Sequence, residues 1–126
     1  MKPETLEWIN KAEADWRTML RESEVSVAPS YDAVCFHAQQ CIEKYLKARL
    51  VDADSPFRKT HDLLNLLESV LLIEPQFKIF YEALTELTVF AVAYRYPGID
   101  ATFEQSRRSV EHCTSIRKAV RGALQL

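Results

Sequence analysis

Two lysines one helical turn apart are the first residues whose types and spacing could do chemistry. Lys44 and Lys47 lie in the stretch Tyr31–Leu50 (YDAVCFHAQQCIEKYLKARL), whose apolar periodicity predicts one long helix. On one side of that helix they could hold a phosphate as point charges. A solvated helix edge with a Glu43–Lys47 ion pair is the commoner arrangement, and on the sequence alone we favour it.

A second candidate is the triplet Thr60-His61-Asp62 at the expected start of a helix. Free backbone N–H groups at a helix start can meet an anion, and His61 could add a hydrogen-bond donor or act as a base. The structural alternative is that Thr60 caps the helix, Asp62 complements its dipole and His61 packs. We favour this alternative for the isolated motif.

The third candidate is Tyr94-Arg95-Tyr96-Pro97, at the expected end of another helix. Arg95 could bind a phosphate bidentately, while the tyrosines, Tyr96 among them, stack on a base or on the guanidinium. Alternatively, Arg95 satisfies the last carbonyls of the helix and pairs with an acidic neighbour. The sequence leaves both interpretations open.

Several other classes of site lack a motif. The cysteines and histidines show no standard metal-ligand spacing, and neither a Gly-rich phosphate loop nor a nucleophile elbow is present. We therefore expect no metal and no cofactor. Cys35, Cys41 and Cys113 form no CxxC pair and are expected to be buried thiols in a reducing cytoplasm.

Composition limits the class of protein. The 126 residues suit one domain, 1–126, and 48% hydrophobic content supports a real core. A net charge of −2 gives no bulk attraction to nucleic acid. Charged residues interrupt the opening stretch, and no apolar run approaches the length of a membrane span, so we expect neither a signal peptide nor a membrane partner.

Helical periodicity recurs along the whole chain. It predicts helices over Leu6 to about Glu22, Tyr31–Leu50 fading near Asp52, His61 to about Leu72, Pro75 to about Tyr94, and Asp100 or Thr102 to the end. The short connections favour antiparallel neighbours. The expected fold is therefore all-α, an up-and-down bundle of four to five helices. The generous apolar surface of the third and fourth helices favours a homodimer.

Three segments together carry a family resemblance: YDAVCFHAQQCIEKYLKARL, then THDLLNLL, then YRYPG. In this order and spacing they resemble the HEPN domain family. The resemblance extends over nearly the whole chain and includes Ala12-x-x-Asp15-Trp16 of the opening helix.

The resemblance implies a dimeric helical bundle from a prokaryote. Family members often stand beside, or are fused to, a minimal nucleotidyltransferase, commonly as toxin–antitoxin pairs. Many are metal-independent ribonucleases that use an Arg-x4-6-His motif at a dimer cleft, where the His moves protons and the Arg stabilises the phosphorane charge. Others were proposed to bind nucleotides.

This chain departs from the catalytic motif. Arg95 stands where the Arg is expected, but the positions for the His hold Asp100, Ala101 and Thr102. Arg107 and His112 fit the spacing formally, yet five residues within one helix place them about 140° apart around its axis. His61 could act as the base only if folding or dimerisation brings it to Arg95.

Three functions therefore compete. The first is a module that binds a nucleotide or RNA beside a minimal nucleotidyltransferase, through Lys44, Lys47, His61, Arg95 and Tyr96. The second is a metal-independent ribonuclease toxin using His61 with Arg95, or Arg107 with His112. The third is a structural or antitoxin-like interaction protein without a ligand. Because the motif lacks its His, we favour binding over catalysis.

Overall fold

The computed structural model describes residues 1–92 and 96–126. Within these residues the chain is helical and contains no strand. The elements in chain order are α1 (Pro3–Ser23), α2 (Tyr31–Asp52), α3 (Leu63–Leu71), the 3₁₀ helix η1 (Pro75–Phe80), α4 (Tyr81–Val92) and α5 (Phe103–Ala123). The predicted all-α fold is confirmed.

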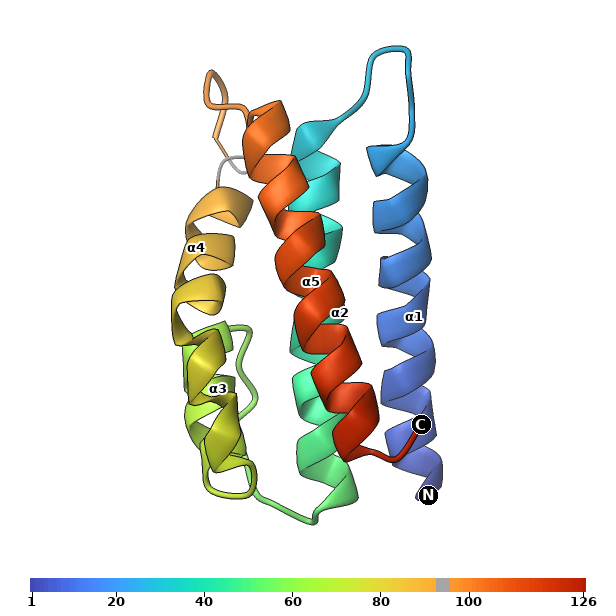
Figure 1. Ribbon diagram of the computed structural model, residues 1–126, viewed down its shortest axis with the longest axis vertical. Coiled ribbons are helices and arrows are strands. Elements are labelled where there is room, and N and C mark those ends of the chain that lie inside the picture. Colours follow the sequence, from blue (N-terminus) through green and yellow to red (C-terminus); the bar gives the residue numbers. More distant parts are fainter. Residues whose placement is uncertain (93–95) are drawn as a thin grey trace.

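The helices form an elongated bundle around α2 (Figure 1). α2 packs against α1, α3, α4 and α5, which makes it the central element. α1, α2 and α5 are the long helices, and α3 and α4 cover the remaining side of α2 (Figure 1). None of the helices in the described part of the chain is long and apolar enough to cross a membrane.

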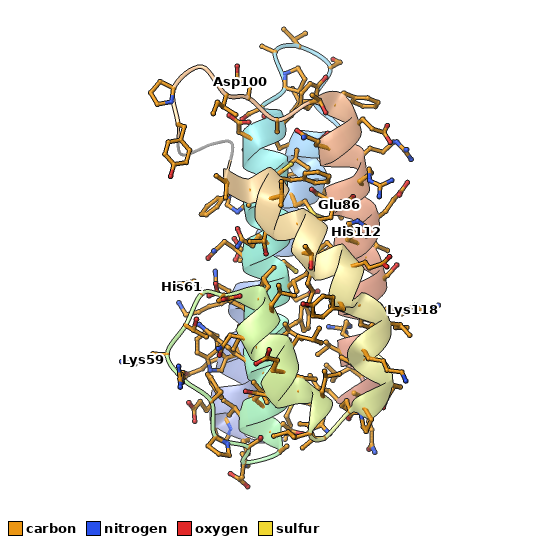
Figure 2. All side chains as sticks on the ribbon, turned by 90° about the vertical axis from the view of Figure 1, so that its left-hand side faces the viewer. Lys59, His61, Glu86, Asp100, His112 and Lys118 are labelled. Atoms are coloured by element: carbon orange, nitrogen blue, oxygen red, sulfur yellow. The ribbon has the colours of Figure 1, made fainter. Side chains whose placement is uncertain are left out.

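One connection differs from a simple up-and-down path. After α2 ends, residues 53–62 run back along the bundle to His61 before α3 begins (Figure 2). Lys59 lies on the same edge of the molecule. This returning segment places His61 beside the middle of α2.

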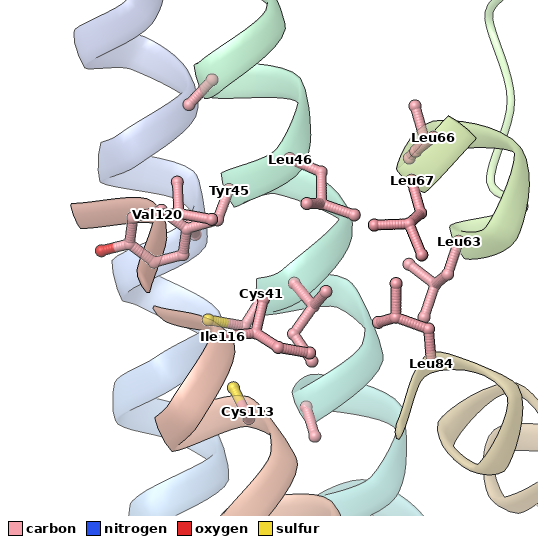
Figure 3. Packing of buried hydrophobic residues seen from close by; sticks show 14 of the residues in the cluster. Cys41, Tyr45, Leu46, Leu63, Leu66, Leu67, Leu84, Cys113, Ile116 and Val120 are labelled. Carbon is pink, nitrogen blue, oxygen red and sulfur yellow. The ribbon is translucent and has the colours of Figure 1, made fainter. Parts of the chain in front are cut away.

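The predicted apolar stripe of α2 forms the centre of the core. Of its eight residues Tyr31 is partly exposed, and the other seven are completely buried: Val34, Cys35, Ala38, Cys41, Ile42, Tyr45 and Leu46. Leu46 meets the leucines of α3 and α4, while Tyr45 and Cys41 face Cys113 and Ile116 of α5 (Figure 3). Ser30 caps the helix, because its Oγ accepts a hydrogen bond from the Ala33 N–H at 3.1 Å.

The start of α3 corrects one expectation. Asp62, and not Thr60, is the N-cap, since its Oδ1 accepts from the N–H groups of Leu64 and Asn65 at 3.0 and 3.3 Å. The Thr60 hydroxyl instead accepts from the Asp62 N–H at 3.0 Å. His61 therefore lies in the connection, and not in the first turn of the helix.

The predicted fourth helix is divided into two elements. η1 covers Pro75–Phe80 and α4 begins at Tyr81. Residues three apart align along a 3₁₀ helix, and the rings of Phe77 and Phe80 meet edge to face with centroids 5.4 Å apart. This aromatic pair lies within η1 and does not extend into α4.

Asp100 and Thr102 were the two predicted N-cap residues of α5. Thr102 and Gln105 form a capping box, so the cap is Thr102 and not Asp100. Phe103, an apolar residue in the first turn of α5, is 59% exposed. Its position in the first turn places it at the end of the bundle, where its ring packs edge-on against Tyr31.

Candidate functional site

A buried polar stripe runs along α2 in steps of four residues. Gln39, Glu43 and Lys47 are only 6%, 3% and 7% exposed. Side chains four residues apart lie one above another on a helix. The predicted Glu43–Lys47 ion pair is present, with Nζ to Oε2 at 3.1 Å, but it is buried and not solvated.

Glu43 also fixes His61. Nδ1 of His61 lies 3.1 Å from both carboxylate oxygens of Glu43. Because a carboxylate only accepts hydrogen bonds, Nδ1 carries the proton in this contact. In the neutral ring Nε2 is then left as an acceptor, on a side chain that is 83% exposed. The pair thus presents an oriented imidazole to solvent.

One pocket lies on the Lys47 side of His61, with a volume of about 450 Å³. Lys47 Nζ stands 5.2 Å from the centroid of the Trp8 ring in its wall. The pocket combines aromatic, cationic, hydroxyl and carboxylate groups from α1, α2 and the returning segment: Glu4, Trp8, Lys47, Phe57, Lys59, Thr60 and His61. Aromatic rings beside ammonium groups suit a base or sugar next to a phosphate.

A second pocket lies on the Gln39 side of His61 and has a volume of about 380 Å³. It is formed by α2, α4 and the start of α3, and its lining consists of Gln39, His61, Asp62, Leu64, Thr88 and Val92. His61 therefore borders both pockets. Glu43 holds it between Gln39 and Lys47 of the polar stripe.

Lys44 faces a different partner from Lys47. Its Nζ bonds to Asp15 Oδ2 on α1, and Asp15 Oδ1 is 2.8 Å from His37 Nδ1. Lys44 lines neither pocket beside His61. The two lysines that share a helix side in the sequence are thus paired with separate carboxylates.

The remaining predicted site residues, Arg95 and Tyr96, follow α4 in the sequence. Tyr96 is 55% exposed and lines neither pocket. Arg95 lies outside the described residues. Val92, three positions before Arg95 in the sequence, lines the second pocket with His61.

The helix start near His61 offers less to an anion than expected. The Asp62 carboxylate already accepts from the N–H groups of Leu64 and Asn65. A ligand beside His61 therefore meets side chains more than free backbone donors.

Arg107 and His112 contact different carboxylates. Arg107 bonds to Glu104 and Glu111 on its own helix. His112 Nε2 lies 3.1 Å from Glu86 on α4, across the bundle from His61 (Figure 2). The formal Arg-x4-His spacing thus does not bring the two side chains to one partner.

Glu86 supplies a prediction of pH-dependent stability. Hydrogen bonds from Arg108, opposed by burial and aided by His112, lower the pKa of Glu86 to about 2 from 4.5. A carboxylate whose pKa is lower in the folded than in the unfolded protein stabilises the fold at pH values above its unfolded-state pKa. This stabilisation is lost as the pH falls from about 4.5 towards 2. We expect Glu86→Gln to cost about 1–2 kcal/mol at pH 7, allowing for partial exposure.

Urea denaturation of both proteins between pH 7 and pH 3 measures this difference. The gap should shrink below pH 4.5. A gap that stays constant down to pH 3 contradicts the assigned role of Glu86.

Three residues of the candidate site were missed by the sequence interpretation. Trp8 and Gln39 were not among the predicted binding residues, and Glu43 was expected only in a solvated ion pair with Lys47. The i, i+4, i+8 spacing of Gln39, Glu43 and Lys47 was the available signal. This spacing could have indicated a polar stripe between apolar ones. It could not have indicated that the stripe is buried.

Within residues 1–92 and 96–126, no three His, Cys, Asp or Glu side chains are arranged to hold a metal ion. The three cysteines are free and buried. Burial raises the pKa of the Cys35 thiol, which keeps it protonated.

Within the described residues the chain is a bundle of helices in which His61 borders two pockets. A family model for the HEPN domain matches residues 5–123, so the chain belongs to the HEPN domain family. Searches of curated proteins and of solved structures gave no match. Membership of this family supports a role related to nucleotides or RNA.

Proposed function

We propose that this HEPN-domain protein binds a nucleotide or RNA across the two pockets that meet at His61. The observation that carries the proposal is the position of His61, held by Glu43 on the border of both pockets. Trp8 and Phe57 supply stacking surfaces beside it, and Lys47 and Lys59 supply positive charge.

The residues differ in their proposed roles. Lys47 is paired with Glu43, whereas Lys59 is exposed and has no ion-pair partner among the described residues. Lys59 is therefore the better phosphate ligand. We assign Arg95 a phosphate contact, and Lys44 and Tyr96 a role only towards RNA that extends beyond the pockets.

Lys59→Ala tests the binding proposal. Loss of one phosphate contact should raise the Kd for a fluorescent single-stranded RNA about three- to tenfold. It should also reduce the slope of log K against log salt by about 0.7. Fluorescence anisotropy at several salt concentrations measures both quantities.

Lys118→Ala is the matched control, because Lys118 is an exposed lysine on α5, away from Lys59 (Figure 2). It should leave the Kd unchanged. If Lys59→Ala and Lys118→Ala raise the Kd equally, the RNA is attracted only by general positive charge. If neither substitution alters RNA binding, the pocket is not the RNA-binding site.

A metal-independent ribonuclease is the competing function, favoured by the oriented imidazole of His61. With Nδ1 bonded to Glu43, Nε2 could accept a proton from a ribose 2′-OH. Cleavage of RNA in the presence of a chelator, abolished by His61→Ala, would establish it. If RNA is bound but not cleaved at high protein concentration, the ribonuclease function is rejected and the binding function is kept.

We also propose a homodimer through the outer face of α4. Tyr81 and Val89 are 55% and 63% exposed there, and with Phe90 they line a surface hollow of about 410 Å³. Exposed apolar groups of this kind mark association surfaces. Val89→Glu should shift the protein to a monomer in sedimentation analysis, and an unchanged mass would contradict this interface.

The proposed biological setting follows the family resemblance. A minimal nucleotidyltransferase is the proposed partner, in a prokaryotic toxin–antitoxin-like pair located in the cytoplasm. Free, buried thiols are consistent with a reducing compartment. Co-purification with a nucleotidyltransferase encoded beside the gene tests the pairing. A stable complex without RNA or nucleotide binding would favour a ligand-free interaction protein.

A further inference from the structure

We propose that the pocket between α2, α3 and α4 binds a nucleobase with an exocyclic amino group, read by Gln39 and Asp62. The inference rests on the proposed function and assigns the second pocket its ligand class. It starts from the polar stripe of α2 and uses residues that the first pocket leaves free.

Gln39 is the residue that points to a ligand. It is 6% exposed, and its amide has no hydrogen-bond partner among the described residues. In that part of the chain no side-chain nitrogen or oxygen is both sealed from solvent and unpaired. The Gln39 amide therefore reaches solvent, and the pocket that it lines is where it does so.

The pocket suits a flat, partly apolar molecule. Leu64 and Val92 provide aliphatic surface, and its volume of about 380 Å³ leaves room for one base. The Thr88 hydroxyl donates to the Leu84 carbonyl at 2.9 Å, so its oxygen remains able to accept. Stacking against aliphatic walls with a few fixed polar groups is typical of small-molecule sites.

The polar groups favour an amino-bearing edge. The Gln39 amide places a donor beside an acceptor, which matches the ring nitrogen and amine of a base. Asp62 Oδ1 is occupied by the helix N–H groups, which leaves Oδ2 to accept a further hydrogen bond. A carboxylate accepts from the amine of cytosine and opposes the O4 carbonyl of uracil.

The positions of the two pockets also define the path of a bound RNA strand. Because His61 borders both pockets, a base beside Gln39 places its ribose and phosphate near the imidazole. The adjoining nucleotide then reaches Trp8 and Lys59 in the first pocket. The second pocket is thus assigned to selecting the base, and the first pocket, on the other side of His61, to binding the RNA backbone.

Binding of oligocytidylate and oligouridylate, each about five nucleotides long, tests the assignment. The wild type should bind oligocytidylate about tenfold more tightly, since one hydrogen bond to a charged acceptor separates the ligands. Asp62→Asn keeps a good helix cap but replaces the accepting oxygen by an amide, and should bring the two Kd values within about twofold.

Gln39→Met should weaken binding of both oligomers about tenfold, because the base loses its bidentate partner. Gln40→Met is the matched control, as Gln40 lines neither pocket, and both Kd values should stay unchanged. Circular dichroism melting confirms that each variant is folded before its Kd is compared.

The outcomes separate the two proposals. Equal wild-type affinity for both oligomers, or a preference that survives Asp62→Asn, overturns the base subsite. If Lys59→Ala still weakens binding in that case, RNA binding in the first pocket remains. If neither oligomer binds to the folded wild type, the proposed function and this subsite are overturned together.

Discussion

Replacing Glu43 by alanine is expected to lower the free energy of unfolding by about 3 kcal/mol. Lys47 would be left as a buried charge, because both side chains of the pair are less than 10% exposed. His61 would also lose the carboxylate that orients it. Breaking a buried pair from one side is costly since the remaining charge stays desolvated.

Chemical denaturation and thermal melting measure this loss, and a fall in Tm of about 10 °C is expected for a domain of this size. The matched control is the double variant Glu43→Leu with Lys47→Met, which removes both charges. Its stability should return close to that of the wild type. A double variant as unstable as Glu43→Ala would show that packing, and not the unpaired charge, sets the cost.

The second large effect is expected at Tyr45, where we predict that Tyr45→Ala costs about 4 kcal/mol. Tyr45 is fully buried between α1, α2 and α5. Its hydroxyl donates to Glu13 Oε2 at 2.5 Å and accepts from Arg121 Nη1 at 3.1 Å. The substitution leaves a cavity in the core and removes the centre of a polar network.

Tyr45→Phe separates the two contributions, because it keeps the ring and removes only the hydroxyl. Glu13 retains its bonds from Arg117 at 2.7 and 2.8 Å, so this change should cost about 1 kcal/mol. Burial, together with donation to Glu13, raises the pKa of Tyr45 to about 12, which keeps the phenol protonated at neutral pH. Equal losses in the two variants, measured by urea denaturation, would contradict a packing role for the ring.

The core of the fold was predictable because α2 carries its pattern locally. The apolar residues of Tyr31–Leu50 recur at helical spacing without Gly or Pro, and the helix begins and ends where expected. The α3 cap was not predictable, because Thr60 and Asp62 are both good N-cap residues. In the structure Asp62 is the cap, and the Thr60 hydroxyl accepts from the Asp62 N–H.

The candidate site was only partly predictable for a similar reason. Spacing placed Lys44 and Lys47 on one side of a helix, but carboxylates elsewhere decide where each ammonium group points. Asp15 binds Lys44 from α1, 29 residues away in the sequence. Glu43 was expected to form a surface pair, and its burial depends on tertiary packing that no local pattern contains.

Titration of ¹⁵N-labelled protein with single-stranded RNA tests the central claim most directly. We predict the largest chemical-shift changes at the Trp8 indole, the Gln39 side-chain amide, His61 and the backbone of residues 57–62. Little change is expected around Lys118. Shifts that gather on α5 while Trp8, Gln39 and His61 stay unchanged would contradict a nucleic-acid site at His61.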